Sequence, residues 1–346
     1  MDIYILDEAF DIVDIIDDFE GLIWDTSFFK RGFFELKVPV SRLSGILKGR
    51  YVYRSDSIYT GRIDTISIDG LVLTVSGSFL ESLLDFRVDI AGREFSGCVE
   101  TAMHNLVRDN ALGARAIHGL TLGTDKQRGV NGIFSAFGKG LAEYFYSLAE
   151  AHNLSFNVRY IPEAKKLEFN VIEGLNRTQS QNINAWCVFS QEMENVDSEN
   201  YETNTHYPNF AYVLGENRTG STRVRVEVDE TNGEERRELF VDASDLQQLP
   251  GMNNAVYAEM LKQRGHENLI EAGRFETVDF VVSPDSDMVF GLGDICTYRH
   301  TALNKVFELQ VTEIKETHEK GRVNRNVVLG RYNLGIVETI RKGVTG

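Results

Sequence analysis

A strict alternation of apolar and polar residues near the N-terminus is the feature that most constrains this chain. Residues 22–40 read LIWDTSFFKRGFFELKVPV, in which two apolar runs face each other across a Lys-Arg-Gly segment. Trp24 lies in the first run, and in the second Phe34, Leu36, Val38 and Val40 fall on one face, with Glu35 and Lys37 on the other. A period of two is that of a β-strand with one buried and one exposed face. The stretch therefore predicts a hairpin with one buried face.

The rest of the first 85 residues shows the same alternating pattern. Short alternating strands are expected at residues 3–7, 10–17, 51–54, 59–69 and 71–78. Asp69-Gly70 is a strong signal for a two-residue hairpin, and residues 41–49 fit a short helical or irregular crossover. Many short strands joined by tight turns are typical of a closed barrel or of a sandwich, and alternation alone does not separate the two.

The middle of the chain changes to helical spacing. Residues 96–113 predict a helix with Ser96 as its N-cap and Gly113 just beyond its C-terminus. A second helix is expected over 136–152, followed by an alternating hairpin over 154–171. These elements predict a small α/β unit.

From about residue 185 the sequence again shows patterns typical of β-strands. Asn232-Gly233 predicts a hairpin between the strand-like runs 221–229 and 236–243. A helix is expected at 253–264, and the last strands, 307–319 and 323–332, form a long hairpin around Gly321. The apolar face of that hairpin is irregular near Val311, which indicates a β-bulge.

Composition and charge exclude several classes of protein. The formal net charge is −16, which speaks against sequence-specific nucleic-acid binding because that needs a basic face. No run approaches eighteen apolar residues, so no membrane span is expected. Cys98, Cys187 and Cys296 lie far apart without paired spacing, and we expect buried, reduced thiols rather than a disulfide framework or a zinc ribbon.

The sequence has no recognisable catalytic motif, which predicts that the protein is not an enzyme. The chain contains no GxxxxGK[ST], HExxH or GxSxG motif, and its seven histidines lack metal-ligand spacing. A glycosidase needs two carboxylates placed across a cleft, which spacing cannot show in a chain with 52 acids. We therefore predict no catalytic residue, no cofactor and no metal ion.

Several stretches together resemble one family, the hub proteins at the tail tip or baseplate of tailed bacteriophages and related prophages. The first match is a Trp-bearing strand followed by a Gly turn, Phe-Glu-Leu and a proline, here Trp24, Gly32, residues 34–36 and Pro39. The other matching stretches follow in the expected order at residues 73–88, 169–182, 207–216, 235–246 and 292–330. Each stretch is a strand or turn signal, and the ordered set carries the resemblance.

The resemblance implies a β-rich α+β fold with two antiparallel β-barrel domains and a small α/β domain. It places the first barrel at 1–88, with Trp24, Phe34, Leu36 and Val38 in its core. The α/β domain would span 89–184 with 243–272, and the second barrel would span 185–242 with 273–346.

The resemblance also implies a structural role in the virion tail, for a protein made in the bacterial host cytoplasm. Such hubs are homotrimers whose six barrels join the sixfold tail tube and distal tail ring to the threefold tip. Partners would include the tape-measure protein and tip or fibre proteins, and DNA would pass through a lumen that an acidic wall keeps from binding it. The alternatives are a hub with cell-wall hydrolase or host-surface binding activity, or the equivalent hub of a contractile injection device.

Overall fold

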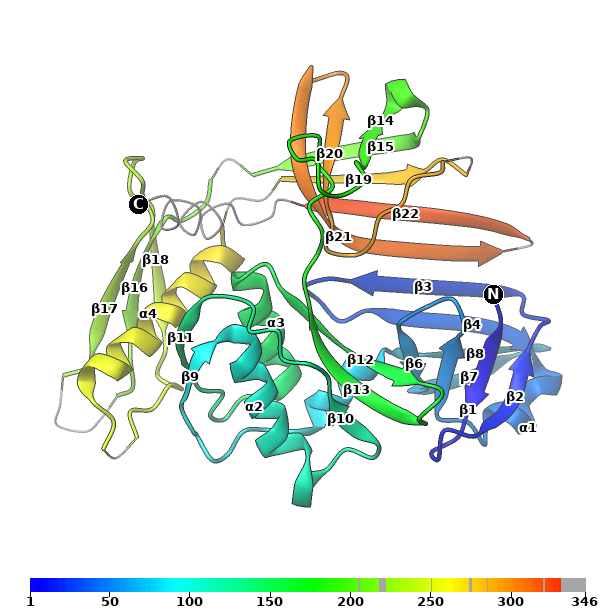
Figure 1. The fold of residues 1–346 in the computed structure, drawn as a ribbon, viewed down its shortest axis with the longest axis horizontal. Helices are drawn as coiled ribbons and strands as arrows, with labels where there is room; N and C mark the ends of the chain where they lie inside the picture. The colour runs from blue at the N-terminus through cyan, green and yellow to red at the C-terminus, as the bar shows by residue number, and fades with distance from the viewer. Residues whose placement is uncertain are drawn as a thin grey trace.

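The computed structural model describes residues 1–330 except 205, 218–221, 250, 274–275, 285 and 320. The described residues form four hydrophobic core clusters, and the strands and helices are grouped around them. Figure 1 shows the N-terminal strands at the lower right, the α/β unit beside them, α4 with β16–β18 at the left, and the C-terminal strands at the top.

The N-terminal unit is built from two sheets that face each other. Its elements are β1 (Ile3–Leu6), β2 (Ile12–Ile16), β3 (Gly21–Ser27), β4 (Phe33–Pro39), η1 (Val40–Arg42), α1 (Leu43–Ile46), β5 (Tyr51–Arg54), β6 (Thr60–Arg62), β7 (Thr65–Asp69) and β8 (Val72–Ser78). One sheet has the order β2-β1-β5-β6, and β3, β4, β8 and β7 belong to the other. The predicted pairing of 3–7 with 10–17 and the hairpin at Asp69-Gly70 are confirmed, and Gly70 has the positive φ of 61° that such a turn favours.

The α/β unit packs two helices on a three-stranded sheet. It comprises η2 (Leu80–Phe86), β9 (Phe95–Cys98), α2 (Val99–Ala111), η3 (Gly113–Arg115), β10 (Leu120–Leu122), β11 (Asn131–Phe134), α3 (Leu141–Ala151), β12 (Ser155–Ile161) and β13 (Lys166–Ile172). The prediction of Ser96 as N-cap was wrong, because Ser96 lies in β9 and pairs with Ile133 of β11, so the helix begins after Cys98. Gly113 follows the helix with a φ of 65°, as predicted.

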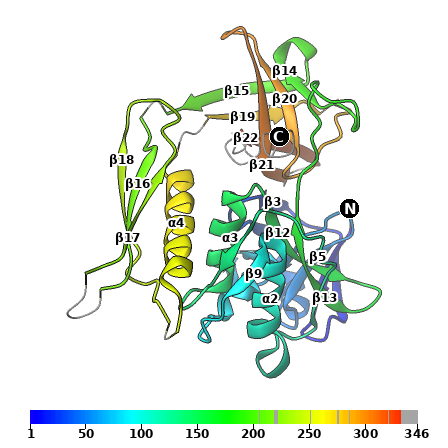
Figure 2. The same ribbon diagram turned by 60° about the vertical axis from the view of Figure 1, so that its left-hand side comes forward.

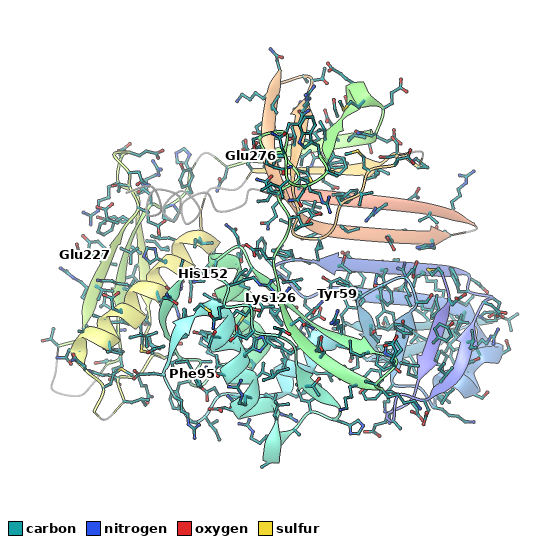
Figure 3. All side chains as sticks on the ribbon, in the orientation of Figure 1. Tyr59, Phe95, Lys126, His152, Glu227 and Glu276 are labelled. Carbon is teal, nitrogen blue, oxygen red and sulfur yellow. The ribbon has the colours of Figure 1, made fainter. Side chains whose placement is uncertain are left out.

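A separate three-stranded sheet and a helix interrupt the C-terminal β region. The strands are β16 (Phe210–Leu214), β17 (Arg225–Asp229) and β18 (Glu238–Asp242), and the helix is α4 (Asn254–Glu271). In Figure 2 the helix lies between this sheet and α3. His152 at the end of α3, labelled in Figure 3, has its Nε2 3.2 Å from Nε2 of Gln263 on α4.

Two predictions for this segment were wrong, each for a physical reason. The turn at Asn232-Gly233 exists with positive φ at both residues, but β17 and β18 do not pair with each other; they flank β16 in the order β17-β16-β18. The predicted helix ended before Gly265, whereas α4 continues to Glu271. A Cβ at Gly265 would lie 2.6 Å from Val228 and 2.7 Å from Val213, so this glycine allows the helix to approach the sheet and does not end it.

The C-terminal unit returns to β-strands, which pair antiparallel except for the parallel β14–β20 pair. It comprises β14 (Val188–Ser190), η4 (Gln191–Met193), β15 (Val196–Thr203), β19 (Glu276–Val282), β20 (Ile295–His300), β21 (Lys305–Glu319) and β22 (Arg322–Gly330). The long β21–β22 hairpin is confirmed, and its register shifts between Val311 and Glu313, where the bulge was predicted. The part of the expected second barrel at 331–346 lies outside the described residues.

The two β units are joined in one ten-stranded sheet, because β21 pairs with β3. The fold is β-rich with several antiparallel sheets, and the strand path through the described residues does not close into a barrel. One edge of β3 pairs with β21 and not with β2, so the two N-terminal sheets are not joined at this edge. The division of the chain into two barrels and one α/β domain stays a prediction.

A buried acid marks the joint between the N-terminal unit and the α/β unit. Glu81 in η2 is 3% exposed, its Oε2 has no hydrogen-bond partner, and Tyr59 and Tyr146 lie close enough to interact electrostatically with it. Figure 3 labels Tyr59 at this joint. Burial raises the pKa of Glu81 from 4.5 to about 8, so the folded chain holds a proton that the unfolded chain releases.

We expect Glu81→Gln to remove a pH dependence of stability. In the natural chain the bound proton makes its full contribution to the free energy of unfolding below pH 4.5, and this contribution is lost as the pH rises to about 8. The free energy of unfolding falls by about 4–5 kcal/mol over this range, at about 1.4 kcal/mol per pH unit. Thermal unfolding measured between pH 5 and 9 should show this slope in the natural chain and a flatter profile in Glu81→Gln. The exposed Glu94→Gln should keep the natural slope, and equal slopes in all three proteins would contradict the assignment.

Candidate functional site

The candidate site is one face and the two edges of the sheet that spans both β units. Eight strands follow one another in the order β15-β19-β22-β21-β3-β4-β8-β7, and every neighbouring pair is antiparallel. The views agree that β3 and β21 lie side by side where the two units meet (Figures 1 and 2). The path ends at β15 and at β7, and neither outer edge has a partner strand among the described residues.

The inner face of this sheet carries the side chains that the sequence placed in a core. Trp24, Phe34, Leu36 and Val38 are all buried in one cluster, with exposed fractions of 0–3%. The rings of Trp24 and Phe34 are 5.8 Å apart, and Nε1 of Trp24 donates a hydrogen bond of 3.2 Å to Ser57 Oγ. The structure therefore brings the four residues together on one side of β3 and β4.

The opposite side, which we call the polar sheet face, runs across all eight strands. It consists of the side chains that alternate with the buried ones, and it is rich in serine, threonine, asparagine and acidic residues. The charged residues of this face are the acids Asp25, Glu35, Asp69, Asp197, Glu202, Asp279, Glu308, Glu313 and Glu319 and the bases Lys37, Lys315 and Arg322. None of them is classed as buried, and acids outnumber bases by nine to three among the described residues of the face.

The acids of the polar sheet face crowd one another at the junction of the two β units. Asp25 on β3 is paired with Lys315 on β21, and Ser27 beside it is paired with Glu313. Burial, together with the negative charge of Glu313, raises the pKa of Asp25 above its usual value, and Lys315 opposes the shift. Burial and one neighbouring carboxylate of the same face therefore both disfavour the charged form of Asp25.

An ion-pair cluster under the sheet fixes the junction from the inner side. Arg54 is 4% exposed, its Nη1 donates a 2.9 Å hydrogen bond to Glu316 Oε2 on β21, and its guanidinium lies 5.0 Å from the centre of the Trp24 ring. His318, with Arg54 and Arg325, lowers the pKa of Glu316 to about 2 against the opposing effect of burial. The two β units are thus held together by charges as well as by the β3–β21 ladder.

A second joint, which sequence reasoning missed, ties the linker after β13 to the start of β20. Asp294 is 5% exposed and accepts hydrogen bonds from Arg177 Nε at 2.6 Å, from the Leu175 amide at 2.7 Å and from the Gly291 amide at 2.9 Å. A Cβ at Gly174 would lie 1.7 Å from the carbonyl oxygen of Gly293, so the two backbones touch at this point. Both segments belong to stretches that carried the family resemblance, but nothing in their spacing shows that they meet.

Neither a group of potential metal ligands nor a membrane-crossing helix is found among the described residues. No group of three or more His, Cys, Asp or Glu side chains there is placed to hold a metal ion. None of the described helices has the length and apolar character needed to cross a membrane. The three cysteines are free and buried.

Three solved structures with a similar fold are described as tail proteins, two of them from prophages. Prophage tail protein gp18 from Listeria monocytogenes EGD-e aligns with a TM-score of 0.58 at 13% identity, over 100% of both chains. The tail protein from Neisseria meningitidis MC58 aligns at 0.59 and 12%, over 96% of this chain and 97% of the other. The 43 kDa tail protein of prophage MuSo2 from Shewanella oneidensis aligns at 0.57 and 11%, over 96% and 98%. At these identities the likeness concerns the fold.

The family assignment rests on the sequence. No curated protein sequence matches the chain significantly. A family model, described as Siphovirus ReqiPepy6 Gp37-like protein, matches residues 2–331 and so covers nearly the whole chain. The chain therefore belongs to the Siphovirus ReqiPepy6 Gp37-like protein family.

Proposed function

We propose that this protein is a non-enzymatic hub that closes into a trimeric ring at the tail tip. The observation that carries the proposal is the eight-stranded antiparallel path with an unpaired outer strand at each end. Unpaired strand edges are a liability that proteins usually cover, twist or charge. Pairing β7 of one copy with β15 of the next would satisfy both edges.

The direction of the strands favours this closure. Because the path holds an even number of antiparallel strands, β7 and β15 run in opposite directions. Copies related by rotation about an axis along the strands would therefore meet in antiparallel pairing, like every other pair in the path. Such head-to-tail contacts are heterologous, and an unpaired edge remains at each end of the assembly until the ring closes.

The same path supports the match between threefold and sixfold symmetry. Each copy contributes two four-stranded groups, β15-β19-β22-β21 and β3-β4-β8-β7, so three copies would present six groups. The expectation that three copies assemble comes from the family resemblance. In this proposal the ring contacts the sixfold distal tail ring and tail tube on one side and the tip or fibre proteins on the other.

The polar sheet face would line the lumen of the ring. The inner face of the sheet is occupied by the apolar core, which leaves the polar sheet face for the other side. Three copies would present its excess of carboxylates around a channel used by the tape-measure protein and DNA. Repulsion over a Debye length of about 8 Å would keep DNA from adhering to the wall.

The ring can be tested by cross-linking its proposed seam. Ser67 on β7 and Asn200 on β15 are exposed, whereas the native cysteines are buried, so a chain carrying Ser67→Cys and Asn200→Cys has little competing reactivity. Treatment of assembled tails, or of the chain mixed with its distal tail ring protein, with a short bis-maleimide should give dimers and trimers on a denaturing gel and nothing larger.

Each single variant is the matched control. With only one introduced cysteine at the seam, neither variant can form the β7–β15 cross-link, and the trimer band should disappear. A ladder that continues beyond three copies would exclude a closed trimer. Light scattering that shows only monomer in the presence of the ring partner would contradict the proposal as a whole.

A further inference from the structure

Two buried thiols face each other at the first rung of the β14–β20 pair. These strands are parallel, with Val188 opposite Thr297, so the preceding residues Cys187 and Cys296 are also opposite each other. The Thr297 amide donates a 3.0 Å hydrogen bond to the carbonyl oxygen of Cys187, which continues the ladder at this rung. Both side chains are 0% exposed and belong to the same core cluster.

The general spacing of paired strands is one that a disulfide can bridge. Neighbouring strands lie about 4.8 Å apart, and the Cα atoms of disulfide-bonded residues are usually about 4.4–6.8 Å apart. The neighbouring Cys187 thiol and burial raise the pKa of Cys296. The reduced pair therefore has few thiolate groups, and its oxidation is slow while the strands stay paired.

We propose that Cys187 and Cys296 are an oxidation site that forms an intrachain disulfide when the protein leaves a reducing compartment. One thiol loses its proton and attacks a small-molecule disulfide, forming a mixed disulfide and releasing one small thiol. The second protein thiol then attacks the mixed disulfide and releases the other small thiol. Two protein thiols are oxidised and one small disulfide is reduced to two thiols, which take up both protons.

The bond would act as a lock on the C-terminal β unit. It closes the chain between residues 187 and 296, a loop that contains β15, β19 and the whole segment of β16–β18 and α4. Constraining a loop of this size in the unfolded chain stabilises the folded one. It would also hold the three-residue strand β14 against local separation from β20.

The timing of the oxidation rests on the proposed function, although the chemistry does not. A tail protein is folded and assembled in cytoplasm that keeps thiols reduced, and it then functions outside the cell. The pair would therefore leave folding unhindered and stabilise the released particle.

The test is a count of free thiols in the purified full chain. Samples are incubated with oxidised glutathione or with dithiothreitol, then denatured and alkylated, and their mass and peptides are measured. To allow β14 to open, the incubation is repeated a few degrees below the unfolding midpoint. We expect three alkylated cysteines in the reduced sample. In the oxidised sample we expect one, at Cys98, together with a linked peptide containing Cys187 and Cys296 and a raised unfolding temperature.

Cys98 provides the internal control, because it is buried in the α/β unit with its Sγ 3.1 Å from Thr101 Oγ1. Cys98→Ser should respond to the oxidant as the natural chain does. Cys187→Ser and Cys296→Ser should each lose both the linked peptide and the rise in unfolding temperature. Three free thiols after oxidation at both temperatures, or a disulfide that includes Cys98, would overturn the proposal. This result would not depend on whether the chain forms a trimer.

Discussion

Phe34→Asp is expected to abolish soluble folding of the chain. The Phe34 ring is 0% exposed, lies against Trp24, and fills the space beside Gly61, where a Cβ would be only 2.3 Å from it. Truncating a buried phenylalanine costs about 3–5 kcal/mol, and an unpaired buried carboxylate costs several more. The sum is comparable with the whole stability of an ordinary domain, about 5–15 kcal/mol. Soluble yield and circular dichroism of the purified variant measure the effect.

The neighbouring residue gives a matched control. Phe33 precedes Phe34 in β4, but its side chain is on the polar sheet face and 44% exposed. Phe33→Asp adds the same charge to the same strand and should leave a folded, soluble protein. If Phe34→Asp folded normally and Phe33→Asp did not, the two faces of the sheet would have been assigned in reverse.

The difference between these two residues could be predicted from the sequence because strand alternation is local. Period-two patterns gave the hairpins of the N-terminal unit, the β12–β13 pair and the long β21–β22 hairpin with its bulge. These pairings join strands that are neighbours in the chain, so the turn between them is visible in the sequence. The side chains that form the polar sheet face follow from the same alternation once the strands are ordered.

The order of distant strands could not be predicted. β3 and β21 are nearly 300 residues apart, and neither carries a signal for the other. A turn motif fixes a local reversal of the chain but not the strand that fills the space beside it, which is why β17 and β18 flank β16 despite the turn at Asn232-Gly233. Glycine often ends a helix, so the sequence predicts an end of the helix before Gly265. The structure shows instead that Gly265 packs closely against the neighbouring sheet. These are effects of tertiary structure on local preference.

Gly174→Ala is expected to open the joint between the α/β unit and the C-terminal β unit. The added Cβ would lie 1.7 Å from the Gly293 carbonyl oxygen and 2.6 Å from the Asp294 amide, and both are backbone atoms that no side-chain rotation can move away. Relieving the clash requires the linker to separate from the loop before β20. That movement would break the hydrogen bonds that Asp294 accepts from Arg177 and from the Leu175 amide.

The size of the effect follows from the burial of Asp294. Leaving one member of a buried ion pair without its partner costs about 3–5 kcal/mol, which is more than a surface substitution costs. Hydrogen exchange should become faster at residues 174–178 and 293–297, and the unfolding temperature should fall. The junction of β3 with β21 should remain protected, because it is held separately by Arg54 and Glu316.

Gly291→Ala separates the clash from a general sensitivity of this loop. Its Cβ would meet only the Asp294 carboxylate, at an ordinary contact distance of 3.8 Å, and its amide can still donate to that carboxylate. We expect near-natural stability and exchange. If Gly174→Ala behaved in the same way, the close backbone contact with Gly293 would not hold the units together. The β3–β21 ladder and its ion pairs would then have to fix the position of the C-terminal unit by themselves.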